Sequence, residues 1–465
     1  MNYRIKLSHL SIDGFRGFAQ AIDLSFDEHL TVLIGANGTG KSTILDALAM
    51  GMMYLRSEIT GGKLFDFPLP LDPVKNKNYD VNNDRNSFEN VLDLRFTRFG
   101  VDEVANTLVN FDNAALSEDR FVLRGTPTTT SNMEGYLTPD GVSSNQGGDL
   151  GKLMGHFYNE KLKRKLTNVP ILVYYGCNSI TTDTAQATID GTARLTHLDM
   201  FDTYKQSLEA REFNFGQLLL MLDRRQKTIL QNGEKNDRFL DALEIAIAGM
   251  LNDADGATYG RLRIYYGALF DEPMVDKTIH EKTMPLYLNQ LSSGEKYLLG
   301  LVADLVRRLY LANTEGDLLH GEGIVLIDEI DLHLHPKWQQ KVIGKLMDIF
   351  PNVQFVVTTH SPIILGGIAS KHIRTLLNGM IYSAEHTYGR EIDDILEVIM
   401  QVNAGKYTEA IKEIARLIAS NQLADAEKVI KEIQREIDDV GDNSSDHPDL
   451  LRMQILLNRK KILNK

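Results

Sequence analysis

The sequence predicts an α/β fold in which parallel strands bring polar residues to one edge of a sheet. Three observations support this prediction. An apolar run at residues 30–34 is followed by a glycine-rich segment, residues 35–43, and then by a helical pattern. A second apolar run, residues 324–327, ends in two adjacent carboxylates, and a third, residues 353–359, ends in a histidine. Because such strands end at the same edge of a sheet, these residues are expected to form one site.

The glycine-rich segment is predicted to be a phosphate-binding loop. Its sequence, GANGTGKST, fits the pattern G-x-x-x-x-G-K-[ST] between a strand and a helix. In such a loop the backbone N–H groups point at phosphates, and the positive end of the helix expected at residues 42–54 adds to the attraction. Lys41 is expected to reach the β- and γ-phosphates and Ser42 to ligate Mg²⁺. The other candidate nucleotide-binding residues of the loop are Gly35, Asn37, Gly38, Gly40 and Thr43.

Length and composition indicate a large globular protein. The chain has 465 residues, of which 43% are hydrophobic and 8% aromatic. At roughly 150 residues per domain, this length predicts two or three domains with a substantial core. The single cysteine, Cys177, cannot form an intramolecular disulfide, which suits a reducing cytoplasm.

Hydropathy and charge argue against two classes of protein. No apolar run approaches the roughly 20 residues that span a bilayer, and the first residues lead into a strand pattern rather than a signal peptide. We therefore expect a cytoplasmic protein without membrane contact. The formal net charge of −13 argues against a general nucleic-acid coat, so any DNA contact must come from a local patch.

Residues 1–175 are predicted to form a first lobe that holds the loop and an antiparallel β-subdomain. Apolar alternation typical of strands recurs at residues 5–12, 22–26, 91–99, 120–124 and 170–175. The turn at residues 14–18 presents Arg16 beside the expected nucleotide site. Arg16 is a candidate to stack on adenine or to pair with phosphate, although a solvated turn arginine is an equally good interpretation.

Residues 176–257 are predicted to form a helical insertion. From Phe201 to Leu251 the apolar residues follow helical spacing, which suits a compact helical hairpin. At about fifty residues, the stretch is too short for a coiled-coil arm of dozens of heptads.

Residues 258–380 are predicted to form the second lobe. Strand patterns at residues 261–269 and 284–288 lead into a long amphipathic helix. Its start carries four candidate nucleotide contacts, Ser292, Ser293, Gly294 and Glu295. Serine and glycine N–H groups at a helix N-terminus form an anion site, but the phosphate-binding loop already supplies one. A second cradle on the same chain indicates that two chains share each ATP.

The apolar strand at residues 324–327 ends in Asp328 and Glu329. This arrangement is expected to place Asp328 in the Mg²⁺ shell and Glu329 near a water that attacks the γ-phosphate. His333 and His335 follow in a loop with no cysteine or third histidine nearby, which argues against a metal site there and favours a dimer interface.

A helix is expected at residues 338–350, and the strand at residues 353–359 then delivers His360. A histidine at the carboxyl end of such a strand can contact the γ-phosphate and orient the attacking water. We therefore treat His360, together with Glu329, as a candidate catalytic residue.

In their order along the chain, these motifs resemble the ABC-type ATPases. The matching segments are residues 35–43, 291–295, 324–329, Asp331 and His360, which are similar to the Walker A, signature, Walker B, D-loop and switch histidine of that superfamily. The run EIDLHLHP with THSP is similar to the soluble branch that contains RecF, the OLD-family nucleases and bacterial defence ATPases. The resemblance covers residues 1–380 without the insertions. The Q-loop glutamine of the family cannot be placed, and Asn178 and Gln186 are its candidates.

Residues 381–465 are predicted to form a small all-helical module that docks a partner. Helical spacing recurs at residues 392–402, 407–419, 423–440 and from Pro448 onward. OLD-type nucleases carry a Toprim domain in this position, with an early Glu and an Asp-x-Asp at strand ends. No strand-borne acidic set of this kind occurs after Ser361, so we expect no intrinsic nuclease.

This layout is similar to the PtuA family, the ATPases of Septu and retron-associated anti-phage systems. The tail contributes Asp449-Leu450 and Arg459-Lys460-Lys461 to the resemblance. The resemblance implies a homodimer with ATP and Mg²⁺ sandwiched between its two ATPase domains, and it leaves a higher oligomer open. This dimer is expected to regulate a separate PtuB-like HNH nuclease. One alternative is a RecF- or SMC-like repair ATPase that itself binds DNA in a salt-sensitive, ATP-dependent manner. Another is a scaffold in which ATP merely fixes the dimer.

Overall fold

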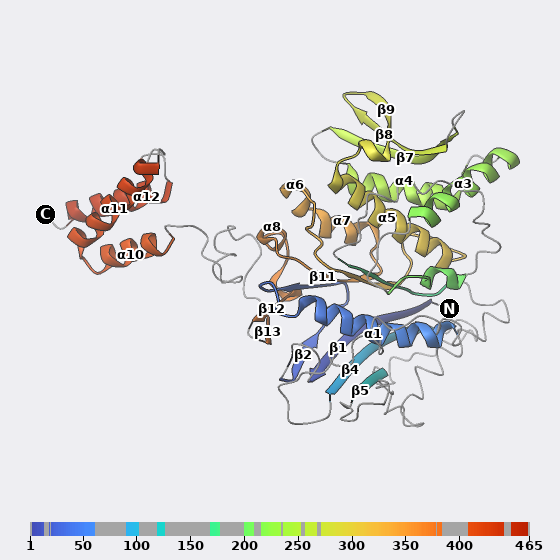
Figure 1. Cartoon of the computed structure of the whole chain (residues 1–465), viewed down its shortest axis with the longest axis horizontal. Helices are drawn as coiled ribbons and strands as arrows, with labels where there is room; N and C mark the ends of the chain where they lie inside the picture. The colour runs from blue at the N-terminus through green and yellow to red at the C-terminus, as the bar shows by residue number, and fades with distance from the viewer. Residues whose placement is uncertain are drawn as a thin grey trace, which may run out of the picture. The chain divides into compact units, whose positions relative to one another are not determined.

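Two compact units make up the chain, Met1–Gly389 and Arg390–Lys465. The computed structural model describes residues 2–13, 18, 20–60, 90–101, 119–125, 168–176, 200–208, 215–233, 236–252, 256–266, 271–377, 379–383, 408–440 and 448–463. Figure 1 shows the helices and strands of both units. Within the described ranges, none of the helices combines the length and the hydropathy of a bilayer-spanning segment.

A six-stranded, mostly parallel sheet forms the core of the first unit. Its strands lie in the order β13-β12-β3-β11-β10-β6. Their bounds are Leu30–Ile34 (β3), Ile171–Tyr175 (β6), Gly323–Ile327 (β10), Val353–Thr358 (β11), Ile373–Leu377 (β12) and Met380–Ser383 (β13). β13 pairs antiparallel with β12, and the other five strands pair in parallel. Every residue of β3, β6, β10 and β11 is buried, as expected for strands covered on both faces.

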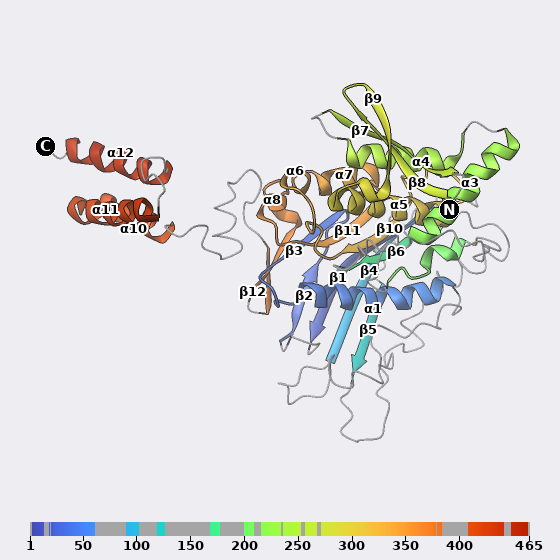
Figure 2. The ribbon, with the colours of Figure 1, turned by 45° about the horizontal axis from the view of Figure 1, so that its top comes forward.

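Helices cover both faces of this sheet. Helix α1 (Lys41–Thr60) lies on one face and α5 (Ser293–Ala312) on the other, as Figures 1 and 2 show from two directions. Both helices were predicted, although α1 continues beyond its expected end at Tyr54. The parallel pairing brings the carboxyl ends of β3, β10 and β11 to the same edge, between these two helical layers.

A four-stranded antiparallel sheet confirms the predicted β-subdomain. Its order is β2-β1-β4-β5, with the bounds Asn2–Asp13 (β1), Ile22–Ser25 (β2), Asn90–Val101 (β4) and Asp119–Gly125 (β5). The buried side chain of Gln354 in β11 ties it to the main sheet. The Gln354 amide accepts from the N–H of Leu7 at 2.7 Å and donates to the carbonyl oxygens of Leu7 and Asp27 at 2.9 and 2.7 Å.

Along the chain, the segment between β6 and β10 forms helices and a third sheet. The helical elements are η3 (Met200–Tyr204), α3 (Phe215–Asn232) and α4 (Arg238–Leu251). An antiparallel sheet of β7 (Ala257–Tyr266), β8 (Asp271–Ile279) and β9 (Lys282–Tyr287) follows, and β7 packs on α4. The expectation of two strands here missed β8. Its sequence, DEPMVDKTI, has little apolar alternation, and pairing on both sides makes it a strand.

The segment after β10 differs from the single helix expected at residues 338–350. It consists of α6 (Pro336–Gln339) and α7 (Val342–Ile349), separated by Gln340 and Lys341. α7 turns four apolar residues into the core, while the Gln339 side chain of α6 bonds back to the preceding loop. One straight helix would not make both the core contacts of α7 and the contact of Gln339 with the loop. The remaining short elements are η4 (Leu288–Gln290), α8 (Pro362–Leu365) and η5 (Ser370–His372).

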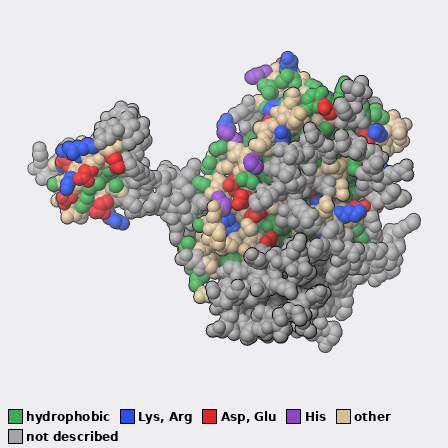
Figure 3. All heavy atoms as spheres, in the orientation of Figure 1, with side chains coloured by type: hydrophobic (Ala, Val, Ile, Leu, Met, Phe, Trp, Pro, Cys, Tyr) green, Lys and Arg blue, Asp and Glu red, His purple; other side chains and the backbone are tan. Residues whose placement is uncertain are grey.

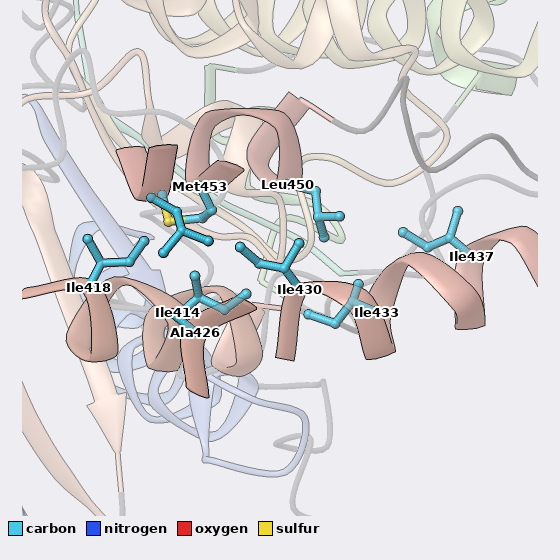
Figure 4. Close-up of a cluster of buried hydrophobic side chains, with 9 residues drawn as sticks. Ile414, Ile418, Ala426, Ile430, Ile433, Ile437, Leu450 and Met453 are labelled. Atoms are coloured by element: carbon cyan, nitrogen blue, oxygen red, sulfur yellow. The ribbon is translucent and has the colours of Figure 1, made fainter. Parts of the chain in front are cut away.

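The described part of the second unit consists of α10 (Thr408–Ala419), α11 (Leu423–Val440) and α12 (Pro448–Leu463). These helices match the predicted ones, while the helix expected at residues 392–402 lies outside the described residues. They bury a core of their own, drawn in Figure 4: Ile414, Ile418, Ala426, Ile430, Ile433, Ile437, Leu450, Met453 and Leu457. Figure 3 shows charged side chains over the visible face of this unit, with hydrophobic ones between them.

Candidate functional site

The predicted phosphate-binding loop connects β3 to α1. Gly38 and Gly40 have φ angles of +80° and +101°, which residues with a Cβ rarely adopt. At Gly40 an added Cβ would lie 2.5 Å from the Cζ atom of Phe18, so this glycine also permits a close contact. The loop therefore has the curled backbone that lets successive N–H groups surround a phosphate.

Lys41, at the start of α1, points back over this loop. Its Nζ atom donates to the carbonyl oxygen of Gly35 at 2.9 Å. Burial lowers the pKa of the Lys41 ammonium, and three carboxylates, those of Asp328, Glu329 and Asp331, oppose that shift. The fold thus places the lysine within the electrostatic reach of the acidic residues predicted to share its site.

Ser42 and Asp328 are far apart in the sequence and meet in the structure. The Oγ atom of Ser42 donates to Oδ2 of Asp328 at 2.8 Å. The backbone N–H of Asp328 donates to the carbonyl oxygen of Tyr175 in the adjacent strand β6, at 2.8 Å, which fixes the end of β10. A hydroxyl beside a carboxylate presents oxygen ligands of the kind that hard divalent cations prefer.

Glu329 follows Asp328 in an unusual backbone conformation. Its φ angle is +50°, a left-handed value that is uncommon for a residue other than glycine. Its backbone N–H donates to the Oγ1 atom of Thr358 at 2.8 Å. The side chain is partly exposed at the edge of the sheet where the phosphate-binding loop begins.

His360 follows β11 at the same edge. Its backbone N–H donates to Oδ1 of Asp331 at 3.3 Å. Burial lowers the pKa of the His360 imidazole and the charge of Lys41 lowers it further, against three nearby carboxylates. At neutral pH the ring is therefore mostly uncharged, and one of its nitrogens can accept a hydrogen bond.

The signature residues form the first turn of α5. Ser292 is the N-cap: its Oγ accepts from the N–H of Glu295 at 3.3 Å, while the Glu295 carboxylate accepts from the N–H of Ser292 at 2.7 Å. Ser292 and Ser293 are exposed, and Gly294 is buried so closely that an added Cβ would lie 2.8 Å from the carbonyl oxygen of His333. Within the described residues, neither serine is hydrogen-bonded to the phosphate-binding loop of its own chain.

Of the remaining predicted residues, some lie in or beside the phosphate-binding loop and others lie outside the described residues. Asn37 is exposed in the loop and Thr43 is partly buried in the first turn of α1. In the part of the chain that the structure describes, no group of three or more His, Cys, Asp and Glu residues could hold a metal ion. Arg16, Cys177, Asn178 and Gln186 lie outside the described residues.

Three residues that contact this site were not singled out from the sequence. Thr358 binds Asp328, Thr359 binds Asp331, and Gln339 contacts the backbone of the loop after β10. The two threonines stand in an apolar β-branched run, where a threonine is an ordinary strand residue. Their position directly before His360 is the signal that could have identified them.

Two protein-family models match most of the first unit. A model described as "AAA domain" matches residues 9–240, and a second AAA-domain model, whose description mentions the AbiEii toxin and type IV TA systems, matches residues 155–366. The chain is 28% identical over 452 residues to the retron Ec83 probable ATPase of Escherichia coli, covering 92% of this chain and 83% of that protein.

Two further likenesses are more limited. Septu protein PtuA of Bacillus mycoides is 38% identical over 90 residues, which cover 19% of this chain and 12% of that protein. The SMC head domain from Thermotoga maritima superposes with a TM-score of 0.38 at 14% identity, covering 82% of this chain and all of that one (100%).

The loop of residues 35–43 and the acidic strand end of β10 both lie within the matched ranges, and Ser42 of the loop meets Asp328 at that strand end. The chain is a P-loop protein of the AAA/ABC ATPase type, related in sequence to the retron Ec83 probable ATPase and, over a shorter segment, to Septu protein PtuA.

Proposed function

We propose that this chain is the ATP-hydrolysing subunit of an anti-phage defence complex, in which it holds and regulates a separate HNH nuclease. The observation that carries the ATPase part is the meeting of Ser42 with Asp328 beside Lys41, at the edge of the sheet that also presents Glu329 and His360. The relation to the retron ATPase and to PtuA supports the defence role.

In this proposal each residue of the site has a distinct task. Lys41 binds the β- and γ-phosphates, and Ser42 and Asp328 hold Mg²⁺. A bound Mg²⁺ neutralises charge that develops on the phosphates. Glu329 accepts a proton from the attacking water, and the neutral ring of His360 orients that water by hydrogen bonding.

We further propose that two chains assemble head to tail. Ser292 and Ser293 are exposed at the N-terminus of α5. Because the N–H and Oγ of Ser292 already bond to Glu295, the Ser293 hydroxyl and the positive helix N-terminus are the groups suited to a γ-phosphate, while the chain's own loop binds its own ATP. In the dimer, this turn would cap the ATP that is bound to the partner's loop. Asp331, in the loop against which Gly294 packs, would lie at the same interface.

Two substitutions test the ATPase assignment. Glu329→Gln removes the proposed base but keeps the shape of the side chain, so turnover should fall by about 10²- to 10⁴-fold while ATP still binds. Lys41→Ala should instead weaken ATP binding. Equilibrium binding of a fluorescent ATP analogue and phosphate release measure the two effects separately. Wild-type turnover by Glu329→Gln would refute the catalytic assignment.

The second unit offers a surface for the nuclease on α12. Leu451, Ile455 and Leu456 are 47%, 59% and 40% exposed on the side of the helix away from its core. Arg452 and Arg459 lie on the same side, and within the described residues neither forms an ion pair. An apolar stripe flanked by two arginines suits an amphipathic segment with acidic residues, and we assign this segment to the nuclease subunit.

Co-expression with the neighbouring open reading frame tests this assignment. Wild-type chain should co-purify with a small HNH protein, and Ile455→Glu should abolish that complex because it places a carboxylate in the apolar stripe. Leu230→Glu on α3, where Leu230 is 72% exposed, is the matched control and should retain the complex. A lone chain that binds DNA only with ATP would instead favour a RecF- or SMC-like repair function.

A further inference from the structure

Two adjacent threonines, Thr358 at the end of strand β11 and Thr359 directly after it, precede His360. Thr358 and Thr359 are both completely buried, with 0% of each residue exposed. Successive side chains of a strand point to opposite faces, so the two hydroxyls reach different neighbours. Each of them donates to a carboxylate of the loop that follows β10, and the two carboxylates belong to different motifs.

The hydroxyl of Thr358 connects the carboxylate of Asp328, the proposed Mg²⁺ ligand, to the backbone of Glu329, the proposed base. It donates to Oδ1 of Asp328 at 2.6 Å and accepts from the N–H of Glu329 at 2.8 Å. Because Oδ1 is held in this way, Oδ2 of Asp328 is the oxygen that faces Ser42. The bond to the Glu329 N–H also supports the left-handed φ of that residue, a conformation that persists only where its surroundings hold it.

The hydroxyl of Thr359 contacts the other carboxylate, that of Asp331. It donates to Oδ1 of Asp331 at 2.6 Å and accepts from the N–H of Ser361 at 3.0 Å. The same Oδ1 atom accepts from the N–H of His360, at 3.3 Å. The position of Asp331 and the start of the His360 segment are therefore coupled through one oxygen atom.

Gln339 completes this second set of contacts from α6. Its Nε2 atom donates to the carbonyl oxygens of Asp331 and Leu334 at 3.3 and 3.1 Å, and its Oε1 atom accepts from the hydroxyl of Ser361 at 2.8 Å. The backbone and the side chain of Asp331 are thus both fixed to the segment after β11. Thr358 is not a partner in any of these contacts.

We infer that Thr358 and Thr359 are positioning residues with separate tasks. Thr358 sets the carboxylate of Asp328 and the backbone of Glu329 for metal binding and water attack within one chain. Thr359, with Gln339, sets Asp331 and His360 for the step that needs the second chain. The inference rests on the proposed ATPase function and extends it to residues that are not expected to touch the nucleotide.

The separation of tasks predicts two different defects. Thr358→Val is nearly isosteric and replaces the hydroxyl with a methyl group, so Asp328 loses its orienting donor. The Mg²⁺ concentration needed for half-maximal binding of a fluorescent ATP analogue should rise about tenfold or more, as expected for a lost hydrogen bond to a charged group. Thr359→Val should leave that concentration within about twofold of wild type, because its contacts do not include Asp328. It should instead reduce ATP-dependent dimerisation, measured by light scattering.

The serine variants are the matched controls. Thr358→Ser and Thr359→Ser keep the hydroxyls and should restore both readouts, which a loss of packing alone would not allow. Thermal unfolding checks that each variant is folded, and Thr358→Ala replaces Thr358→Val if the latter is not.

The outcomes separate this inference from the function on which it rests. An unchanged Mg²⁺ requirement in Thr358→Val, or equal effects of both valine variants on both readouts, would overturn the inference while leaving the ATPase proposal intact. A wild-type chain that binds no Mg²⁺ and ATP would overturn both.

Discussion

The carboxylate of Glu295 lies 2.9 Å from the Nζ atom of Lys277, and this ion pair joins the first turn of α5 to strand β8. Tyr259 of β7 donates a hydrogen bond to the same carboxylate. The ammonium of Lys277 also lies 4.9 Å from the centre of the Tyr259 ring, within the range of a cation–π contact. The three-stranded sheet is therefore fixed to the turn that carries the signature residues.

Replacing Glu295 with Gln tests this connection through its pH dependence. Burial by itself raises the pKa of the Glu295 carboxyl, but hydrogen bonds from Tyr259, Lys277 and Ser292 outweigh it and hold the pKa at about 2. Because this value lies below the ordinary value of 4.5, the stabilising contribution is complete above pH 4.5 and is lost as the pH falls toward 2.

The free energy of unfolding should thus be lower for Glu295→Gln than for wild type between pH 5 and 8, by an amount that is constant with pH. Below the ordinary pKa of glutamate the difference should shrink. Urea unfolding at a series of pH values measures it. A difference that grows on acidification would contradict the assigned hydrogen bonds.

A buried ion-pair cluster on α5 predicts a large loss of stability. Asp304 accepts from Arg307 and Arg308 at 2.6 and 2.7 Å and from the hydroxyl of Tyr175 at 2.8 Å, and the three charged side chains are at most 3% exposed. Asp304→Asn leaves two buried arginines without their counter-ion, so we expect a loss of about 3–5 kcal/mol in the free energy of unfolding. Asp348→Asn, at an exposed position of α7, should change it by less than about 0.5 kcal/mol. Denaturant titrations of both variants provide the comparison.

Gly40→Ala should impair the phosphate-binding loop. The residue would adopt a φ angle of +101° and its Cβ would press against Phe18. We expect a cost of roughly 1–3 kcal/mol in stability together with weaker ATP binding. Gly344→Ala is the control, since its Cβ would meet no atom within 4 Å and the residue lies in α7, where alanine is favoured by about 0.5–1 kcal/mol. Equal stabilisation by both substitutions would contradict the loop geometry.

Ile430→Ala should destabilise the second unit alone. Ile430 is 2% exposed in the core formed by α10, α11 and α12, and large-to-small core substitutions cost about 2–5 kcal/mol. Because this core is separate from that of the first unit, ATP binding should persist while the C-terminal helices become sensitive to limited proteolysis. Ile455→Ala, at an exposed position, should leave proteolysis unchanged. Loss of ATP binding in Ile430→Ala would show that the units depend on each other.

The sequence alone determined most of the elements and the main candidate residues. Apolar runs such as Leu30–Ile34 and Gly323–Ile327 are buried on both faces, so hydrophobicity by itself identifies them as core strands. The glycine pattern of the loop reflects φ angles that other residues rarely adopt, so the loop can also be recognised from the linear sequence. Helices α10 and α11 show clear amphipathic spacing because each buries one face in a small core, whereas α12 also exposes apolar residues on its outer side.

The tertiary structure decided what local patterns cannot encode. β8 exists because two neighbours pair with it, and the split between α6 and α7 arises because Gln339 and the apolar face of α7 have different partners. The threonines before His360 look like ordinary strand residues until the parallel pairing of β10 with β11 brings their hydroxyls to Asp328 and Asp331. Contacts between residues about thirty positions apart depend on sheet order and register, which a linear motif does not contain.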